Sequence, residues 1–349
     1  MAIFAASLIL AASMFIVLGS QLNIGDSRLA YDWKILWRTI EDGHIIWGEG
    51  MFSPPWAMVF LLPLGFVPLE VGWGLMMFLL LVVLIVSVPA CTPRWRQWLG
   101  VVLLVTCYLV MRDFADSNLE AIALGCVLLM LTAYERRWPV LFGWAVLMAT
   151  IKPQITYLLL LVAMLYLYQT SPRAYFLKVC VVILAILIPT FIWQGRPWLD
   201  SLTGRPFDYG ISIKVIWSAL PAGVILALQG SIAGVSLLVA YVGDRQISHP
   251  KAALLIAASL LASSFSNTHS IILVLALGVV PLMLSRPRIG GPLFLLYEIP
   301  YLGLTSLPLD FDTTYWNVVL IITWAVLLGY VYFTERASVP GTDVVVASA

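Results

Sequence analysis

The chain has 349 residues, of which 62% are hydrophobic and only 11% are charged, and its formal net charge is +1. Soluble domains average about 45–50% apolar and about 25% charged residues, and a globule of this length could not bury so much apolar surface. The composition therefore excludes a nucleic-acid binder, a secreted disulfide scaffold and a disordered chain, and it predicts an all-α, polytopic transmembrane helical bundle.

The first segments of the chain predict a membrane helix followed by a helix at the membrane interface. Residues 3–20 are apolar with no basic stretch before them, which predicts a retained first helix rather than a cleaved signal peptide. The first external loop, 21–53, contains a segment at 29–41 with one apolar face at helical spacing: Ala30, Trp33, Trp37 and Ile40. This pattern predicts an amphipathic interfacial helix.

Two long apolar runs, 54–90 and 214–242, exceed the roughly 20 residues that one span requires. Prolines interrupt the first run, so we expect 54–69 to be a re-entrant or interfacial segment bordering a cavity and 71–90 to cross the membrane. In the second run we expect 214–220 to lie at the outer interface and 222–242 to cross.

The other apolar runs alternate with basic and acidic loops, and this alternation predicts the topology. These runs are 98–111, 118–133, 138–151, 154–169, 175–194, 252–266, 269–284, 291–307 and 315–333. Basic residues in short loops mark the cytoplasmic side; here they are Arg94/Arg96, Arg136/Arg137, Arg173/Lys178, Arg245/Lys251, Arg286/Arg288 and Arg336.

Alternating the loops gives about twelve spans with both termini in the cytoplasm. We therefore expect one integral membrane domain over 1–336 with a short polar cytoplasmic tail at 337–349. The predicted location is a bacterial-type plasma (inner) membrane.

Unusual charged residues gather in the expected external loops. Asp26 and Asp32 lie near the start of the amphipathic segment, where a carboxylate can also serve only to cap a helix or favour its dipole. A second group occupies the junction of two apolar runs, where it could be an ordinary hydrophilic turn: Arg112, Asp113, Asp116, Asn118 and Glu120.

Lys152, in Lys152-Pro153-Gln154, is a lone lysine on the expected outer side. Its charge calls for an anionic partner, which is either a protein carboxylate (Asp113, Asp116 or Glu120) or a ligand phosphate. His269, in SFSNTHS, is expected at an outer turn as a functional or a hydrogen-bonded structural residue. Motifs for ATP binding, serine hydrolysis and zinc proteolysis are absent from the sequence.

Three segments resemble a known family. GMFSPPWAMVFLLPLGFVPLEVGWGL (50–75), preceded by Asp32 in YDW, is similar to a signature of the GT-C superfamily of membrane glycosyltransferases, and closest to glycosyltransferase family 87. The segment 117–154 resembles that family's polar turn, helix pair and closing Lys-Pro, with Ser117-Asn118 in place of the usual Gly-Gln. SFSNTHS (264–270) resembles its outer turn in the second half.

The resemblance implies a GT-C-like fold and transfer of a mannose-like sugar from a polyprenyl-phosphate donor to the hydroxyl of a lipid or glycan acceptor at the outer face. The implied general base is Asp32, with Asp26 as runner-up. The implied substrate-binding residues are Lys152, Arg112, Gln154, Asn118, Glu120 and His269. We expect inverting displacement without a metal or other cofactor, because cations can neutralise the leaving phosphate; a divalent ion held by Asp113 and Asp116 is the alternative.

Two other functions fit the composition. A lipid or solute transporter, or a flippase, would also need charges in a membrane cavity, but its usual repeat symmetry is not visible in the sequence. A catalytically inactive relative that binds a lipid-linked glycan is the third hypothesis. Membrane lipids are expected partners of all three, and nucleic acid of none.

Overall fold

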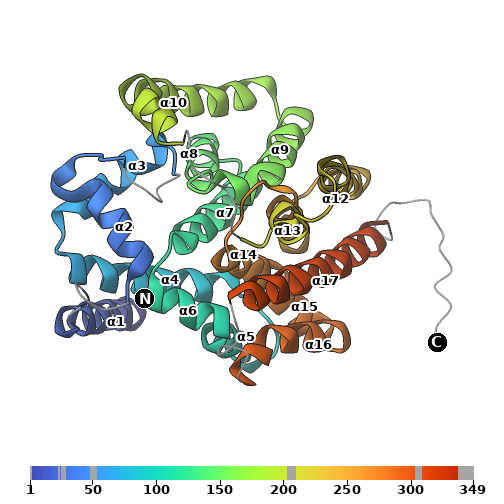
Figure 1. Cartoon of the computed structure of the whole chain (residues 1–349), viewed down its shortest axis with the longest axis horizontal. Helices are drawn as coiled ribbons and strands as arrows, with labels where there is room; N and C mark the ends of the chain where they lie inside the picture. The colour runs from blue at the N-terminus through green and yellow to red at the C-terminus, as the bar shows by residue number, and fades with distance from the viewer. Residues whose placement is uncertain are drawn as a thin grey trace. The chain divides into compact units, whose positions relative to one another are not determined.

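The computed structural model describes residues 2–22, 24, 29–47, 53–202, 210–302 and 309–336, and these residues are helical apart from turns and short connections (Figure 1). Extended backbone pairs within them at one parallel bridge, between Gly210 and Ser266. The predicted all-α class is confirmed. The chain divides into two compact units, 1–153 with 174–206 (unit 1) and 154–173 with 207–349 (unit 2).

Unit 1 contains the helices of the first half of the chain and one long later helix. They are α1 (Ala2–Gln21), α2 (Tyr31–Ile40), α3 (Pro55–Leu61), α4 (Leu69–Ser87), α5 (Arg94–Thr106), α6 (Tyr108–Asp116), α7 (Glu120–Glu135), α8 (Pro139–Ala149) and α10 (Arg173–Leu202). The most extensive packing joins α7 to α8 and α1 to α4. Glycines permit the second contact: a Cβ at Gly19 would lie 2.4 Å from the Glu70 carbonyl oxygen, and one at Gly74 would lie 2.5 Å from that of Phe15.

Unit 2 is built around two buried helical segments, His249–Ala262 and Thr268–Ser285. Its helices are α9 (Pro153–Thr170), α11 (Ile213–Ile216), α12 (Ala222–Val242), α13 (His249–Ala262), α14 (Ile271–Val274), α15 (Val280–Ser285), α16 (Pro287–Glu298) and α17 (Leu309–Arg336). A π-helical turn, Leu275–Val279, joins α14 to α15 directly before Pro281. The wider turn accommodates a ring that would otherwise clash with the carbonyl four residues earlier.

Among the described residues, five helical segments are long and apolar enough to cross a membrane: Leu69–Ser87, Arg173–Leu202, Ala222–Val242, Thr268–Ser285 and Thr313–Thr334. The pair α5 and α6, bent by 58°, makes a sixth if it is one span. Other predicted runs form shorter apolar helices, such as α8 and α13. A multi-helical membrane protein is thus supported, whereas twelve spans and a single membrane domain stay predictions.

Both long apolar runs are broken where the sequence predicts. In 54–90 the short helix α3 and a 3₁₀ turn, Leu62–Phe66, precede α4, which begins directly after Pro68. In 214–242 the short α11 precedes α12, which begins directly after Pro221. Each run therefore supplies one helix long enough to span, while the expected re-entrant position of 54–69 stays a prediction.

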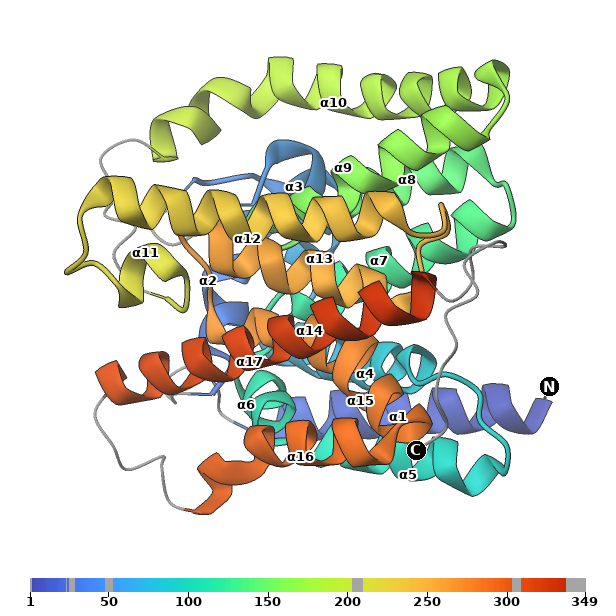
Figure 2. The ribbon, with the colours of Figure 1, turned by 90° about the vertical axis from the view of Figure 1, so that its right-hand side faces the viewer.

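Within each unit, the loops with basic residues lie at one end of the helices (Figure 2). In unit 1 the α4–α5 and α7–α8 connections lie at the same end as the start of α1. In unit 2 the α12–α13 and α15–α16 connections lie at the same end as the end of α17. The alternation of loops inferred from charge is thereby supported inside each unit. Lys251 is an exception, because it is fully buried in the first turn of α13 rather than exposed in a loop.

The predicted amphipathic helix is confirmed as α2, but its apolar face contacts protein. Trp33 and Ile40 are fully buried, and the indole N–H groups of Trp33 and Trp37 donate to the carbonyl oxygens of Leu69 (2.7 Å) and Val67 (2.8 Å). The face expected to lie on lipid therefore packs against the break that precedes α4. This packing fixes α2 on the body of unit 1.

Candidate functional site

The α6–α7 turn presents two of the predicted polar residues. The last turn of α6 closes with Ser117 in the left-handed region (φ 48°), its N–H bonded to the Asp113 carbonyl oxygen at 2.7 Å. Asn118 follows in the turn, and Glu120 is the first residue of α7. A carboxylate in the first helical turn is favoured by the helix dipole, which offsets part of the cost of burying Glu120 completely.

The α8–α9 turn presents Lys152. As the sequence predicts, Pro153 separates two helices: α8 ends at Ala149, and α9 begins at Pro153. Thr150 closes α8 and accepts a hydrogen bond from the Trp56 indole N–H at 2.8 Å. Trp56 belongs to the Ser-Pro-Pro-Trp segment at the start of α3, so this segment holds the turn two residues before Lys152.

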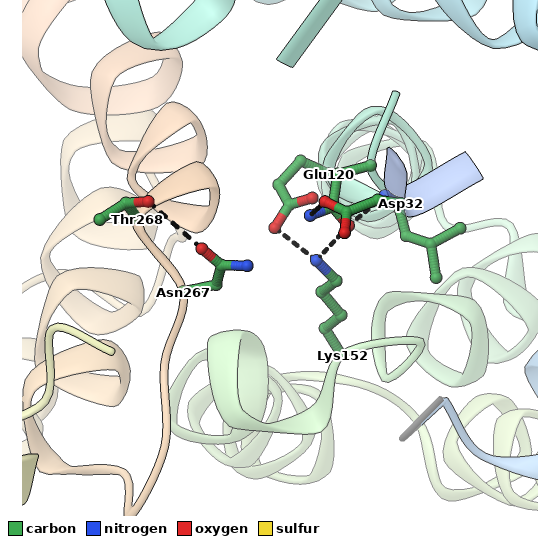
Figure 3. A network of polar contacts seen from close by, with 7 residues as sticks. Asp32, Glu120, Lys152, Asn267 and Thr268 are labelled. Atoms are coloured by element: carbon green, nitrogen blue, oxygen red, sulfur yellow. Dashed lines mark hydrogen bonds and ion pairs between the residues drawn. The ribbon is translucent and has the colours of Figure 1, made fainter. Parts of the chain in front are cut away.

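Four side chains from three parts of unit 1 form one polar chain, which we call the carboxylate–lysine network: Asp32, Asn118, Glu120 and Lys152 (Figure 3). The Lys152 Nζ lies 2.6 Å from Glu120 Oε1 and 2.5 Å from Asn118 Oδ1. The Asn118 Nδ2 donates to Asp32 Oδ2 at 2.5 Å. Of the two anionic partners considered for Lys152, the structure therefore contains the protein carboxylate of Glu120.

The orientation of the Asn118 amide follows from its neighbours. Its Oδ1 accepts from both the Lys152 ammonium and the Leu119 backbone N–H (2.8 Å), and neither of these donors could face an amide NH₂. The NH₂ group must therefore point to Asp32. The Lys152 ammonium thus determines which atoms of Asn118 the Asp32 carboxylate meets.

Asp32 is placed by the start of α2. Ala30 adopts the left-handed region (φ 56°), and its N–H donates to the Ala115 carbonyl oxygen of α6 at 2.7 Å. Asp32 lies in the first helical turn rather than at the cap position, which Ala30 occupies. Glu120 is fully buried, whereas Asp32 and Lys152, whose side chain is 14% exposed, are both partly exposed. With two carboxylates and one ammonium, the network has a formal excess of one negative charge, and of its two carboxylates Asp32 is the partly exposed one.

The remaining charged residues of this region, Arg112, Asp113 and Asp116, lie on α6 itself. Arg112 pairs with Asp116 one turn later at 3.9 Å, with both side chains partly exposed. Asp113 is buried within the same helix. Across the described part of the chain, no three His, Cys, Asp or Glu side chains are grouped as a metal site would require. The metal-independent reaction and the alternative ion at Asp113 and Asp116 both stay predictions.

Two further predicted residues lie elsewhere in the described structure. Gln154 is in the first turn of α9 and the buried His269 is in a 3₁₀ turn before α14, so both belong to unit 2. Asp26 lies outside the described residues. The network itself is built from unit 1 alone.

The sequence interpretation missed the contribution of Trp56. It was quoted only as part of a resemblance, although it holds the end of α8 and stacks edge-on against Trp198 at 5.8 Å. An indole directly after two prolines is a usable signal, because the prolines fix the start of the helix from which the ring projects.

Comparison with known proteins adds no relative to this geometry. The chain matches none of the protein-family models, and no curated protein matches it in sequence. The resemblance to the GT-C glycosyltransferases therefore rests on the three sequence segments alone, and function must be argued from the network.

Proposed function

We propose that the protein is a membrane glycosyltransferase of GT-C type with about twelve spans. It would transfer a mannose-like sugar from a polyprenyl phosphate to the hydroxyl of a lipid or glycan acceptor at the outer face of the membrane. The observation that carries the proposal is the partly exposed Asp32 carboxylate, which a buried amide and ion pair hold in one orientation. General bases require this combination of access and fixed geometry.

In the proposed reaction Asp32 accepts the proton of the acceptor hydroxyl while that oxygen attacks the anomeric carbon of the sugar. The bond between the anomeric carbon and the phosphate oxygen breaks, and the electron pair leaves with the polyprenyl phosphate. Attack opposite the leaving group inverts the anomeric configuration. The network retains its single ammonium throughout, so the proton rests on Asp32 until it exchanges with solvent.

The leaving phosphate requires a cation, and Arg112 suits this role better than Lys152. The Lys152 ammonium is already bound by Glu120 and Asn118, and moving it to a ligand would leave a buried carboxylate without its charge partner. Arg112 lies on α6, the helix that anchors the start of α2, with 34% of its side chain exposed. Its long contact with Asp116 can be exchanged for a bidentate contact with phosphate. Lys152 then contributes mainly by holding Asn118.

Lipid analysis of cells with and without the protein tests this function against the alternatives. Loss of the protein should remove a glycolipid and accumulate an acceptor lighter by one sugar. A transporter or flippase would change the leaflet in which a lipid resides but not its mass, and an inactive binding protein would change neither the masses nor their ratio. An unchanged lipid mass profile would overturn the proposal.

A further inference from the structure

A cavity of about 370 Å³ lies in unit 2, between the α12–α13 connection and the last turns of α17. Its walls include Asp244, Gln246, Ser248, Tyr330 and Thr334. Cavities that bind small ligands are about 300–1,000 Å³ in size. The elements that line this cavity, the α12–α13 connection and the end of α17, lie at the same end of unit 2 as the α15–α16 connection (Figure 2).

The loop that forms one wall is held in a fixed shape by a buried charge. Lys251 is fully buried, and its Nζ donates to the carbonyl oxygens of Asp244 and of Gln246, the latter at 2.9 Å. The same ammonium lies 5.3 Å from the centre of the Tyr166 ring. Burying the charged end of a lysine is costly. The contacts of the buried ammonium hold the loop in one conformation, which a binding site requires.

The polar groups of the cavity suit a protonated amine. Asp244 is exposed and supplies a negative charge to the wall, and Tyr330 supplies an aromatic ring. The Thr334 hydroxyl donates to the Tyr330 carbonyl oxygen (2.7 Å), so its oxygen is directed to accept. Carboxylates, hydroxyl oxygens and aromatic rings are common partners of ammonium groups.

The surroundings suit the rest of a phospholipid. Arg245 follows Asp244 in the chain but does not itself line the cavity. Its guanidinium lies 6.0 Å from the centre of the Tyr241 ring at the end of α12, and a guanidinium can neutralise a phosphate. The helix ends beside the cavity expose apolar side chains that would contact acyl chains: Tyr241, Val242 and Phe333. Adjacent positive and negative charges match a zwitterion with one phosphate and one amine.

We infer that this cavity binds the phosphoethanolamine headgroup of a phospholipid, with the amine on Asp244 and the phosphate on Arg245. The site is independent of the proposed sugar transfer, because it uses other residues in another unit. In this site the buried Lys251 holds the Asp244–Gln246 segment in the conformation that binds the headgroup.

Native mass spectrometry of the purified, delipidated full-length protein tests the site. Phosphatidylethanolamine, phosphatidylcholine and phosphatidylglycerol with identical acyl chains are titrated separately. We expect one phosphatidylethanolamine to bind about tenfold more tightly than either other lipid, the difference of one charge-assisted hydrogen bond. Asp244→Asn should abolish this preference, whereas Asp200→Asn, which alters an exposed aspartate of α10, should retain it.

Equal affinity for phosphatidylethanolamine and phosphatidylcholine, or an unchanged preference in Asp244→Asn, would overturn the inference. Competition with soluble O-phosphoethanolamine separates lipid from soluble ligand: displacement at concentrations equal to those of the lipid would overturn the assignment to a lipid. Lys251→Met is the second variant, and it should weaken binding of all headgroups through the loop. The Asp244 result decides the matter even if this variant does not fold.

Discussion

Two lysines in this apolar chain, the largely enclosed Lys152 and the fully buried Lys251, have different partners for their charge. In unit 1 Lys152 contacts a carboxylate and a side-chain amide; in unit 2 Lys251 contacts backbone carbonyl oxygens and an aromatic ring. An ammonium that is paired with a carboxylate can also fix the orientation of neighbouring side chains, here Asn118 and, through it, Asp32. A charge matched by carbonyl dipoles fixes the shape of a loop. The first arrangement suits chemistry and the second suits a binding wall.

The largest expected effect on stability concerns the ion pair of Lys152. Lys152→Met should cost about 3 kcal/mol of unfolding free energy, because it leaves Glu120 as a buried charge, and Lys152→Met with Glu120→Gln should recover most of it. Thermal unfolding in detergent measures both, with the exposed Lys178→Met as control. A double variant no more stable than Lys152→Met would contradict the ion-pair interpretation.

Asn118→Ala should lower the rate of sugar transfer about 30-fold while donor affinity stays the same, since about 2 kcal/mol of orientation and hydrogen bonding is lost at Asp32. The control is Gln97→Ala, which removes an amide that contacts the Val88 carbonyl oxygen away from the network. If donor affinity falls and the maximal rate does not, Asn118 contacts the substrate directly and is not a positioning residue.

Arg112→Gln should raise the KM for the donor about tenfold, through loss of a charge-assisted contact with phosphate. Arg196→Gln is a closely matched control, because Arg196 and Asp200 have the same spacing and the same 3.9 Å separation as Arg112 and Asp116 but are far more exposed. Equal kinetic effects of the two variants would argue against a phosphate role for Arg112.

The smallest effect concerns the support of the Lys152 turn. Trp56→Phe should cost about 1 kcal/mol by removing the hydrogen bond to Thr150 while keeping an aromatic ring. Trp144→Phe, at a ring that packs edge-on against Phe60, controls for the loss of indole area. Identical losses of stability in the two variants would show that the hydrogen bond contributes nothing.

Much of this architecture could be predicted because membrane helices follow local rules. Helix boundaries can be located without knowledge of tertiary contacts. They follow from the length of each apolar run, from Pro68, Pro153 and Pro221, and from the basic loops. The helix α2 was predicted from its periodicity, but periodicity does not distinguish protein from lipid as the partner of its apolar face. That distinction depends on Leu69 and Val67, some 30 residues away in the chain.

The sequence predicted the residues of the candidate site but not the contacts between them. Lys152 and Glu120 stood out as charges in apolar surroundings, and their pairing was one of several open alternatives. The bridging role of Asn118 could not be predicted, because it depends on two turns and α2 meeting in space. Lys251 was misplaced for a related reason: a basic residue near a helix start is usually exposed, and only the path of the loop shows that carbonyl oxygens surround it.

The central claim is that Asp32 is the reactive end of the carboxylate–lysine network, and the transfer rate of Asp32→Asn tests it most directly. Purified wild-type and variant proteins would be assayed in proteoliposomes with a polyprenyl-phosphate sugar and extracted acceptor lipid, after unfolding curves establish that both are folded. Loss of a positioned general base should lower the rate by about 10²–10⁴ with little change in donor binding. A folded Asp32→Asn protein that transfers sugar at close to the wild-type rate would contradict the account.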